Sequence, residues 1–556
     1  MSEGEISKVL RRIDGRGYKA YKDLAGASEL VNGIEVRVTR VQGDPFAPPS
    51  VVECRFGKVL PAYFVQDDRL IAVADFLHRR LASLLPKLSL RGVGEGGSGK
   101  LSMPHPSPII IPRSAVEARR KGDVVEFTVR LWAGLPSRRR RILGDDALEM
   151  LLERIPKAVS LAVEELSGDN NRLRRHVETW IEQQYIRRTL PKLRLVAFVG
   201  DGSILPRKCG GCWEPLDNAV PFESPSSLRV EIELPTGRTI AGMGLPRGLI
   251  VIAGPAFHGK TTLAEAIASG VWNHIPGDGR ELVVTDESAF YVSSENGRWV
   301  SCVDVSSLIL SLPGGRSTSC FSTVDASGAT SLAASIQEAV EAGAQVIIVD
   351  EDEAASNMIH RDHWAEAVTG KRTLNPLSDV APSMKNEGLS VVIVASGAVP
   401  LLAEADSIIV MDEYRARDAT NYRFEAKKAL KAMGYERGPP YKRPRVRRVV
   451  KPLYVEKVKV KGRMIEGKAL RDRVDLRPLK QLEEEPQVHT AVRAALAIAS
   501  KGGVAIAGEA QRLSEMLWKW DYRAITKTPG PDLAYVRPMD IAFVVNRLPG
   551  LEASII

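Results

Sequence analysis

Short apolar runs separated by polar, helix-forming stretches characterise the middle of the chain. Four of them predict buried strands, at residues 249–253, 282–285, 346–350 and 391–395. Residues 228–234 alternate apolar and charged side chains, which is typical of a strand with one buried face. Because helical stretches lie between the later strands, this part of the chain is predicted to form an α/β sheet.

The two ends of the chain show other patterns. Alternation predicts strands at 33–41 and 124–132, and helical periodicity predicts helices at 70–85 and 147–166. After residue 479 the pattern is helical again. A chain of 556 residues is too long for one core. We therefore expect three domains: an α+β N-terminal domain, 1–205; an α/β domain, 206–425; and a C-terminal domain with a basic strand region and helices, 426–556.

Composition narrows the class of protein. The apolar share of 44% is that of a globular protein. No run of apolar residues reaches the length of a membrane span, and Met1 to Lys8 lack an apolar targeting core, so we expect a cytoplasmic protein without membrane spans. Five cysteines make a disulfide framework unexpected. Cys209 and Cys212 have metal-ligand spacing, but a structural zinc site needs four ligands, and they are interpreted as two thiols on a loop.

The strand at 249–253 leads into a glycine-bounded loop that fits the pattern G-x-x-x-x-G-K-[ST]. Backbone N–H groups of such a loop, and the N-terminus of the helix after it, bind phosphates. Lys260 would reach the β- and γ-phosphates, and the Thr261 hydroxyl would ligate Mg²⁺. The candidate nucleotide-binding residues here are Gly254, His258, Gly259, Lys260, Thr261 and Thr262.

A second glycine-rich loop, residues 92–100, imitates this pattern. Leu101 stands where Ser or Thr is needed, and Pro104 and Pro106 deny the loop a following helix. No buried strand precedes it. It is therefore not predicted to bind a nucleotide, although its glycines would let a nucleic-acid backbone approach closely.

Two carboxylates follow the buried strand at 346–350. Asp350 is placed to hold the Mg²⁺ shell. Glu351 is placed to polarise an attacking water as general base. Ser327 and Gly328 open an Ala-rich helix about twenty residues earlier, and such a helix N-terminus binds anions.

A phosphate loop, then a Ser-Gly helix start, then an Asp-Glu strand is an order that resembles an ABC-type ATPase. More specifically, the chain resembles the family described as predicted ATPases of the ABC class, which is similar to ATPases of mitochondrial RNA-binding complexes. The resemblance covers nearly the whole length of the chain. The sequence segments that carry it are 13–18, 20–22, 41–47, 201–206, 273–281, 325–328 and 350–352.

The resemblance implies a fold class and a chemistry. The fold is α/β, an ABC-type P-loop ATPase core with an α+β N-terminal domain and a basic, mostly helical C-terminal domain. The cofactors are ATP and Mg²⁺, and the activity is ATP hydrolysis, with Lys260, Glu351 and Asp304 as catalytic residues. Ser327 and Gly328 match the ABC signature, which binds the γ-phosphate of ATP held by the other protomer. A homodimer is therefore expected.

Several positions depart from the ABC pattern. Asp304 stands where ABC proteins carry the Q-loop glutamine, and residues 355–357 fall where the D-loop is expected. The strand at 391–395 ends at Ser396, where typical ABC proteins place the switch histidine, so slow hydrolysis is expected. Phe222, ahead of the first strand of the ATPase region, is either a core residue or a platform for adenine.

Basic segments with interleaved tyrosines flank the ATPase region on both sides, which favours a nucleic acid as partner, RNA above DNA. Solvated charge runs and a lysine-guarded edge strand remain alternatives. A nucleotide-gated scaffold and a transport-type ATPase subunit are the alternative functions. The candidate nucleic-acid contacts are Arg16, Lys19, Arg138, Arg139, Arg140, Arg141, Lys442, Arg443, Arg445, Arg447, Arg448, Lys457, Lys459 and Lys461.

Overall fold

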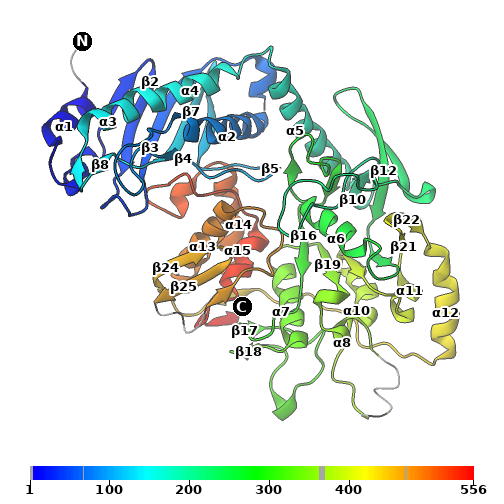
Figure 1. Ribbon diagram of the computed structural model, residues 1–556. Helices are drawn as coiled ribbons and strands as arrows, with labels where there is room; N and C mark the ends of the chain where they lie inside the picture. Colours follow the sequence, from blue (N-terminus) through cyan, green and yellow to red (C-terminus); the bar gives the residue numbers. More distant parts are fainter. Residues whose placement is uncertain (1–3, 67, 362–367, 369, 469, 471–472) are drawn as a thin grey trace. The chain divides into compact units, whose positions relative to one another are not determined.

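The computed structural model describes residues 4–66, 68–361, 368, 370–468, 470 and 473–556. The chain forms two compact units (Figure 1). The N-terminal unit comprises Met1–Trp180 and Glu515–Tyr535, and the core unit comprises Ile181–Ser514 and Val536–Ile556. A late segment of the chain is thus part of the N-terminal unit, whereas the boundaries expected at 205 and 425 divide the chain into consecutive pieces. Among the described residues, no helix has the length and apolar character that crossing a membrane requires.

The N-terminal unit is built on an antiparallel sheet with helices beside it. The central pair is β3 (Ser50–Lys58) and β7 (Val124–Ala133), in register from Ser50 opposite Ala133 to Lys58 opposite Val125. The other strands are β1 (Ser28–Val31), β2 (Ile34–Arg40), β4 (Leu101–Ser102) and β6 (Val116–Lys121), with β8 (Ser137–Arg138) and β9 (Arg141–Ile142) as a separate hairpin. The helices are α1 (Glu5–Ile13), α2 (Arg69–Leu88), α3 (Gly144–Leu148) and α4 (Ile155–Glu164), and α5 (Asn171–Thr189) runs across the boundary between the units.

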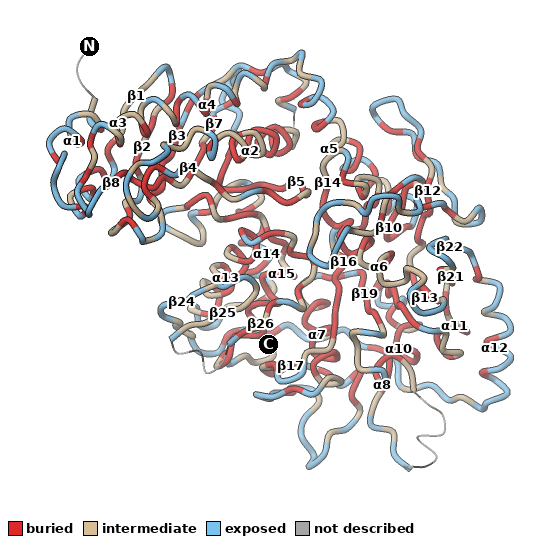
Figure 2. The backbone as a smooth tube through the Cα atoms, in the orientation of Figure 1, coloured by how far each residue is buried: buried red, intermediate tan, exposed pale blue. Residues whose placement is uncertain are grey.

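The core unit is organised by a parallel sheet, of which the first four strands in the order below are buried over their whole length (Figure 2). Its order is β16 (Ala289–Val292), β19 (Val346–Asp350), β20 (Ser390–Val394), β13 (Leu249–Ala253), β21 (Ser407–Asp412) and β22 (Arg415–Asp418), of which only β22 is antiparallel to its neighbour. Three of the four strands predicted from apolar runs lie here. The fourth, near 282–285, does not.

That fourth strand, β15 (Val283–Thr285), pairs in a separate antiparallel sheet. The order of this sheet is β11 (Arg229–Glu233), β12 (Thr239–Pro246), β10 (Leu195–Gly200) and β15. The helices of the core unit are α6 (Lys260–Ser269), α7 (Gly328–Glu341), α8 (Ser356–Ile359), α10 (Leu377–Met384), α11 (Val399–Glu404), α12 (Arg423–Ala432), α13 (Glu485–Ala499) and α15 (Pro538–Val545), with α14 (Ile506–Trp518) running into the N-terminal unit.

Small sheets complete the core unit. They are β17 (Val300–Val303) with β18 (Phe321–Thr323), β23 (Arg447–Val449) with β27 (Ala553–Ile555), and β24 (Glu456–Lys461) with β25 (Met464–Lys468) and β26 (Val474–Asp475). The predicted lysine-rich strand is therefore β24, at the edge of a three-stranded sheet.

Two disulfides correct the expectation of free thiols. Cys209 is bonded to Cys212, and Cys302 is bonded to Cys320. The first pair closes a short loop, where adjacent thiols at this spacing reach each other without any change of fold. The second pair joins residues that are far apart in sequence but adjacent across β17 and the entry to β18. Cys54 is the one free cysteine, and it is buried.

A buried ionic cluster holds α2 in the N-terminal unit. The Asp75 carboxylate has no exposed surface and accepts hydrogen bonds from Arg79 (2.8 Å) and Arg113, and it lies 2.9 Å from His176 Nε2. Burial alone raises the pKa of Asp75, but Arg79 and Arg113, with His176, outweigh burial and hold the pKa well below its usual range.

We expect Asp75→Ala to lower the free energy of unfolding by about 3–5 kcal/mol, because it removes one partner of the buried ion pair between Asp75 and Arg113. Since the pKa of Asp75 is depressed in the folded protein, the advantage of the wild type is complete above pH of about 4 and shrinks as the pH falls below that. Urea unfolding of both proteins at several pH values measures this. The exposed Asp123→Ala is the control, and an equal effect of both substitutions would contradict the assignment.

Candidate functional site

The site lies at the carboxyl end of the parallel sheet, where β13, β19 and β20 end side by side. Register places Ile252 of β13 and Asp350 of β19 both opposite Val394 of β20. The loops that follow these strands are therefore brought to one edge, the position at which open α/β sheets bind ligands.

The phosphate loop after β13 needs its glycines. Gly254 has φ +136°, and a Cβ there would lie 2.2 Å from the Met411 carbonyl oxygen. Gly259, with φ +96°, is the N-cap of α6. Both positions are open to glycine and strained for other residues. Lys260 Nζ donates to the carbonyls of Gly254 (2.9 Å) and Pro255 (2.8 Å), so its ammonium group lies over the loop.

Thr261 and Asp350 meet directly, although they lie far apart in sequence. Thr261 Oγ1 donates to Asp350 Oδ2 at 2.7 Å, and Asp350 Oδ1 accepts from the Asp352 N–H at 3.0 Å. Burial raises the pKa of Asp350, an effect that the hydrogen bond from Thr261 opposes. A hydroxyl and a carboxylate oxygen side by side are the donor set that Mg²⁺ takes when phosphates and water supply its other ligands. No set of three or more His, Cys, Asp or Glu side chains suited to a metal occurs in the described part of the chain.

Glu351 is held from two sides. Its Oε2 accepts hydrogen bonds from the Ser396 N–H (2.8 Å) and the Ser396 hydroxyl (3.0 Å). Its Oε1 lies 3.6 Å from His360 Nε2. Ser396 thus occupies the end of β20, where typical ABC proteins place the switch histidine, and contacts the candidate base. The histidine near Glu351 comes instead from the end of α8, and no sequence pattern pointed to it.

These groups line a pocket of about 950 Å³. Its lining residues from the phosphate loop, β19 and β20 are Gly254, Pro255, Ala256, Phe257, Gly259, Lys260, Thr261, Thr262, Asp350, Glu351, Asp352, Val394, Ala395 and Ser396, and they are joined by Tyr414. The structure therefore brings together most of the residues predicted for nucleotide binding and hydrolysis.

Tyr414 is a lining residue that sequence reasoning missed. It sits in the turn between β21 and β22 with φ +67°, which is unusual for a bulky residue, and it is 58% exposed. Its ring lies against the phosphate loop, with Cδ1 3.3 Å from the place of a Cβ on Gly259. The Glu413 N–H donates to His258 Nδ1 at 2.8 Å, which ties this turn to the loop.

Four of the residues predicted for nucleotide binding and hydrolysis lie outside the pocket lining: His258, Asp304, Ser327 and Gly328. The side chain of His258 faces Asp412 and Glu413 instead. Asp304 follows β17, where its carboxylate accepts from the Ser306 N–H and hydroxyl and lies 3.5 Å from Arg445 Nε. The strand that ends beside Asp350 is β16, so the residues after Val292 hold the place expected for Asp304. That strand was not predicted.

The signature residues form the N-terminus of α7. Ser327 caps the helix, with its hydroxyl accepting from the Thr330 N–H at 3.4 Å, and its side chain is exposed. Neither Ser327 nor Gly328 lines the pocket of its own chain. Phe222 is 4% exposed, which supports the core interpretation and leaves it unavailable for stacking.

Comparison with known families agrees with this geometry. The model for the N-terminal domain of ATPases of the ABC class matches residues 3–166, and the model for the P-loop domain matches residues 169–444. Together they span most of the chain. The chain belongs to the ABC-class ATPases.

Individual relatives of this ABC-class ATPase add little detail. An uncharacterized protein of Methanocaldococcus jannaschii, MJ1628, is 32% identical over 257 residues, which are 44% of this chain and 57% of that protein. The match thus spans little more than half the length of this curated relative. Two solved structures show low similarity. The first is cbiO1 from Clostridium perfringens, part of the ABC transporter complex cbiONQ, with 15% sequence identity and a TM-score of 0.27 over 43% of this chain and 95% of that chain. The second is a putative metal-chelate type ABC transporter, with 14% sequence identity and a TM-score of 0.24 over 43% of this chain and 89% of that chain.

The two basic segments predicted near the N-terminus of this ABC-class ATPase lie together. The Tyr18 N–H donates to the Arg140 carbonyl at 2.8 Å, and Arg141 Nη1 donates to the Gly15 carbonyl at 3.1 Å. Tyr18 and Tyr21 are buried, so they are unavailable for base stacking. The exposed cations that remain form what we call the N-terminal basic patch: Arg16, Lys19, Arg138, Arg139, Arg140 and Arg141.

The glycine-rich loop at 92–100 packs against this patch. The Glu95 N–H donates to the Ser137 carbonyl at 3.2 Å, and the Glu95 carboxylate accepts from the Arg140 N–H at 2.7 Å. A Cβ on Gly134 would lie 1.8 Å from the Gly97 carbonyl oxygen. The glycines therefore allow two backbones to touch, and the loop fixes the arginine hairpin β8–β9.

The C-terminal candidates divide into exposed and buried residues. Arg447 is 1% exposed and donates to Glu341 (2.7 Å), the Ser301 carbonyl (3.0 Å) and Asn546 (3.0 Å), so it is a core residue and not a nucleic-acid contact. Tyr441 is also buried. The exposed candidates are Lys442, Arg443, Arg445, Arg448, Lys457, Lys459 and Lys461.

We expect Tyr414→Ala to weaken ATP binding by about tenfold, because stacking of a base on an aromatic ring is worth roughly 1–3 kcal/mol. Binding of inorganic tripolyphosphate should stay unchanged, since it has no base. Tyr414→Phe keeps the ring and should bind ATP as the wild type does. Titration calorimetry with both ligands measures this, and an equal loss for ATP and tripolyphosphate would show that Tyr414 supports the loop instead.

Proposed function

We propose that this chain binds ATP with Mg²⁺ in the pocket at the carboxyl end of the parallel sheet and hydrolyses it with Glu351 as general base. The observation that carries the proposal is the 2.7 Å hydrogen bond between Thr261 and Asp350. It places the first residue after the loop lysine beside the carboxylate that ends β19, as an ATP–Mg²⁺ site requires.

Each residue has a defined task in this proposal. The loop N–H groups and Lys260 bind the phosphates, and Thr261 and Asp350 hold the metal. Bound Mg²⁺ neutralises charge on the phosphate oxygens. The two hydrogen bonds from Ser396 occupy Glu351 Oε2 and orient the carboxylate. The other oxygen, Oε1, lies 3.6 Å from His360 Nε2 and is the one that would accept a proton from water. A serine at the end of β20 supplies no cationic partner for the γ-phosphate, which supports slow turnover.

The dimer is the second part of the proposal. Ser327 is exposed at the N-terminus of a helix of 14 residues and lies outside the pocket lining of its own chain. A helix N-terminus of this length favours an anion. The γ-phosphate of ATP held by a second copy is such an anion, and two copies related by symmetry would complete two sites.

The third part is a nucleic acid, RNA above DNA, gripped when the dimer closes and released after hydrolysis. Two groups of exposed cations support it: the N-terminal basic patch and the lysines of β24. On β24 the side chains of Lys457, Lys459 and Lys461 are exposed while Val458 and Val460 are half-buried. A row of cations on one face of a strand suits the phosphate backbone.

Replacing Glu351 with glutamine should lower the rate of ATP hydrolysis by about 10²–10⁴-fold and leave ATP affinity within about twofold, because it removes the base but keeps the shape. Lys260→Ala should abolish ATP binding. Phosphate release under single-turnover conditions measures the first effect and equilibrium dialysis the second. Glu425→Gln, on the exposed α12, is the matched control. Wild-type hydrolysis by Glu351→Gln would refute the role of Glu351, and negligible hydrolysis by the wild type would favour a nucleotide-gated scaffold.

A triple substitution of Lys457, Lys459 and Lys461 by glutamine should weaken binding of single-stranded RNA. Three lost phosphate contacts should also reduce the slope of log K against log salt by about 2. Gel-shift titrations across a salt series, with RNA and with DNA, measure both quantities. The same change at Lys427, Lys428 and Lys431 of α12 removes equal charge elsewhere and is the control. Binding that does not depend on salt would contradict the proposal.

A further inference from the structure

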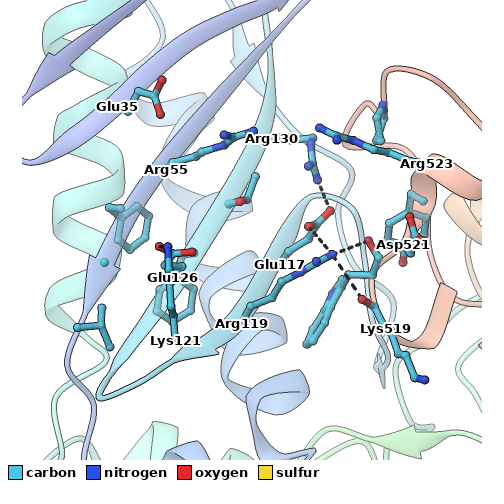
Figure 3. Close-up of a pocket in the computed structure, with 18 of the residues that line it drawn as sticks. Glu35, Arg55, Glu117, Arg119, Lys121, Glu126, Arg130, Lys519, Asp521 and Arg523 are labelled. Carbon is cyan, nitrogen blue, oxygen red and sulfur yellow. Dashed lines mark hydrogen bonds and ion pairs between the residues drawn. The ribbon is translucent and has the colours of Figure 1, made fainter. Parts of the chain in front are cut away.

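The N-terminal unit contains a second pocket, of about 940 Å³, on one face of its sheet (Figure 3). Strands β2, β3, β6 and β7 supply one wall, and the late segment Glu515–Tyr535 supplies the other. This segment is fixed to the sheet side: Ser114 Oγ donates to the Gly530 carbonyl at 2.7 Å, and Tyr522 OH donates to the Pro112 carbonyl at 2.9 Å. The pocket is therefore a built feature of one unit.

Arg55, Glu117, Arg119 and Arg130 line the pocket, and Glu53 lies behind this lining as a partner of two of the arginines. Glu53 accepts from Arg130 Nε at 2.8 Å with one oxygen, and its other oxygen lies 2.6 Å from Arg55 Nη2. Glu117 pairs with Arg130 through one oxygen and lies 3.6 Å from Arg119 through the other. Every oxygen of these two buried carboxylates is therefore engaged with an arginine.

Arg523 adds a further cation to the lining, and the oxygens of Glu53 and Glu117 are already engaged with other arginines. Figure 3 shows the side chains of Arg55 and Arg523 directed toward Arg130 from opposite sides. Arg523 is exposed, and within the described ranges its side chain forms no hydrogen bond or ion pair. Converging guanidinium groups repel one another unless an anion lies between them, and their fork of donors matches phosphate.

Trp520 and Asp521 suit a ligand that carries a base and a sugar as well as a phosphate. The indole Nε1 of Trp520 is buried and has no hydrogen-bond partner. The Trp520 backbone has φ +57°, rare for a bulky residue, and its carbonyl accepts from Arg119 at 3.1 Å, which fixes the residue at the pocket. Asp521, also in the lining, offers a carboxylate of the kind that accepts hydrogen bonds from ribose hydroxyls.

We propose that this pocket binds a nucleoside monophosphate, with the phosphate between Arg55 and Arg523, the ribose at Asp521 and the base at Trp520. The site is separate from the phosphate loop and lies in the other unit. The same chemistry is offered by a free mononucleotide and by the phosphorylated end of a nucleic-acid strand.

The experiment uses the full chain carrying Lys260→Ala, so that the phosphate loop does not take up the probe. Titration calorimetry with AMP should give one site per chain, with adenosine and inorganic phosphate each at least tenfold weaker. Arg523→Gln should weaken AMP binding at least tenfold. Trp520→Ala should weaken AMP several-fold and leave inorganic phosphate unchanged. Arg91→Gln, at an exposed arginine of the same unit outside the pocket lining, is the matched control and should change nothing.

A hexanucleotide with and without a 5′-phosphate separates the two sources. Displacement of AMP by the phosphorylated strand alone identifies a strand end as the ligand, and no displacement by either identifies the free mononucleotide. Absence of AMP binding at millimolar concentration, or AMP binding that Arg523→Gln leaves intact, would overturn the proposal. Because the phosphate loop is disabled throughout, these outcomes do not depend on ATP hydrolysis by the wild type.

Discussion

The register of three parallel strands, β19, β20 and β13, is the constraint on which the rest of the core unit depends. A slip of one residue in β19 would turn Asp350 away from Thr261, because successive side chains point to opposite faces. The strands are buried on both faces and made almost entirely of Val, Ile and Leu, so their register is set by packing rather than by polar contacts. The polar groups appear only where the strands end. The packing of an apolar sheet thus determines the positions of the polar side chains of the site.

A second constraint acts on α7, the helix that carries Ser327. Glu338 and Glu341 of this helix are buried, and three buried arginines surround them: Arg298 after β16, Arg447 of β23, and Arg547 after α15. Arg547 also pairs with Glu295, whose pKa is lowered because Arg547 and Arg298 outweigh the effect of burial. Removing one partner of such a network costs several kcal/mol. These ion pairs therefore hold α7 against Arg547, in the C-terminal part of the chain.

Sequence patterns predicted the parts of the site that are local. The strand and loop from Leu249 to Thr261, and the strand that ends at Asp350, are each a short continuous stretch of sequence, so apolar runs and glycine positions were sufficient. Contacts between distant segments had no such signal. Tyr414 reaches the phosphate loop through a hairpin more than 150 residues away, and His360 reaches Glu351 through α8. The assignment of Asp304 to the Q-loop position rested on its order in the chain. In the structure the strand beside β19 is β16, and Asp304 follows β17 instead.

The roles of the basic residues were also only partly predictable from the sequence. The net charge of +9 is not a measure of the positive charge available at the surface. Several arginines instead work inside the protein, paired with carboxylates or backbone carbonyls: Arg113, Arg130, Arg280, Arg298, Arg447, Arg537 and Arg547. Arg447 belongs to a run of basic residues whose composition gave no reason to separate it from its exposed neighbours Arg445 and Arg448. Side chains alternate between the two faces of a strand, so one cation of the run, Arg447, faces inward. Its ion pair with the buried side chain of Glu341 shows that its role is structural. Exposed cations remain at the arginine hairpin β8–β9, on β24 and at Arg523.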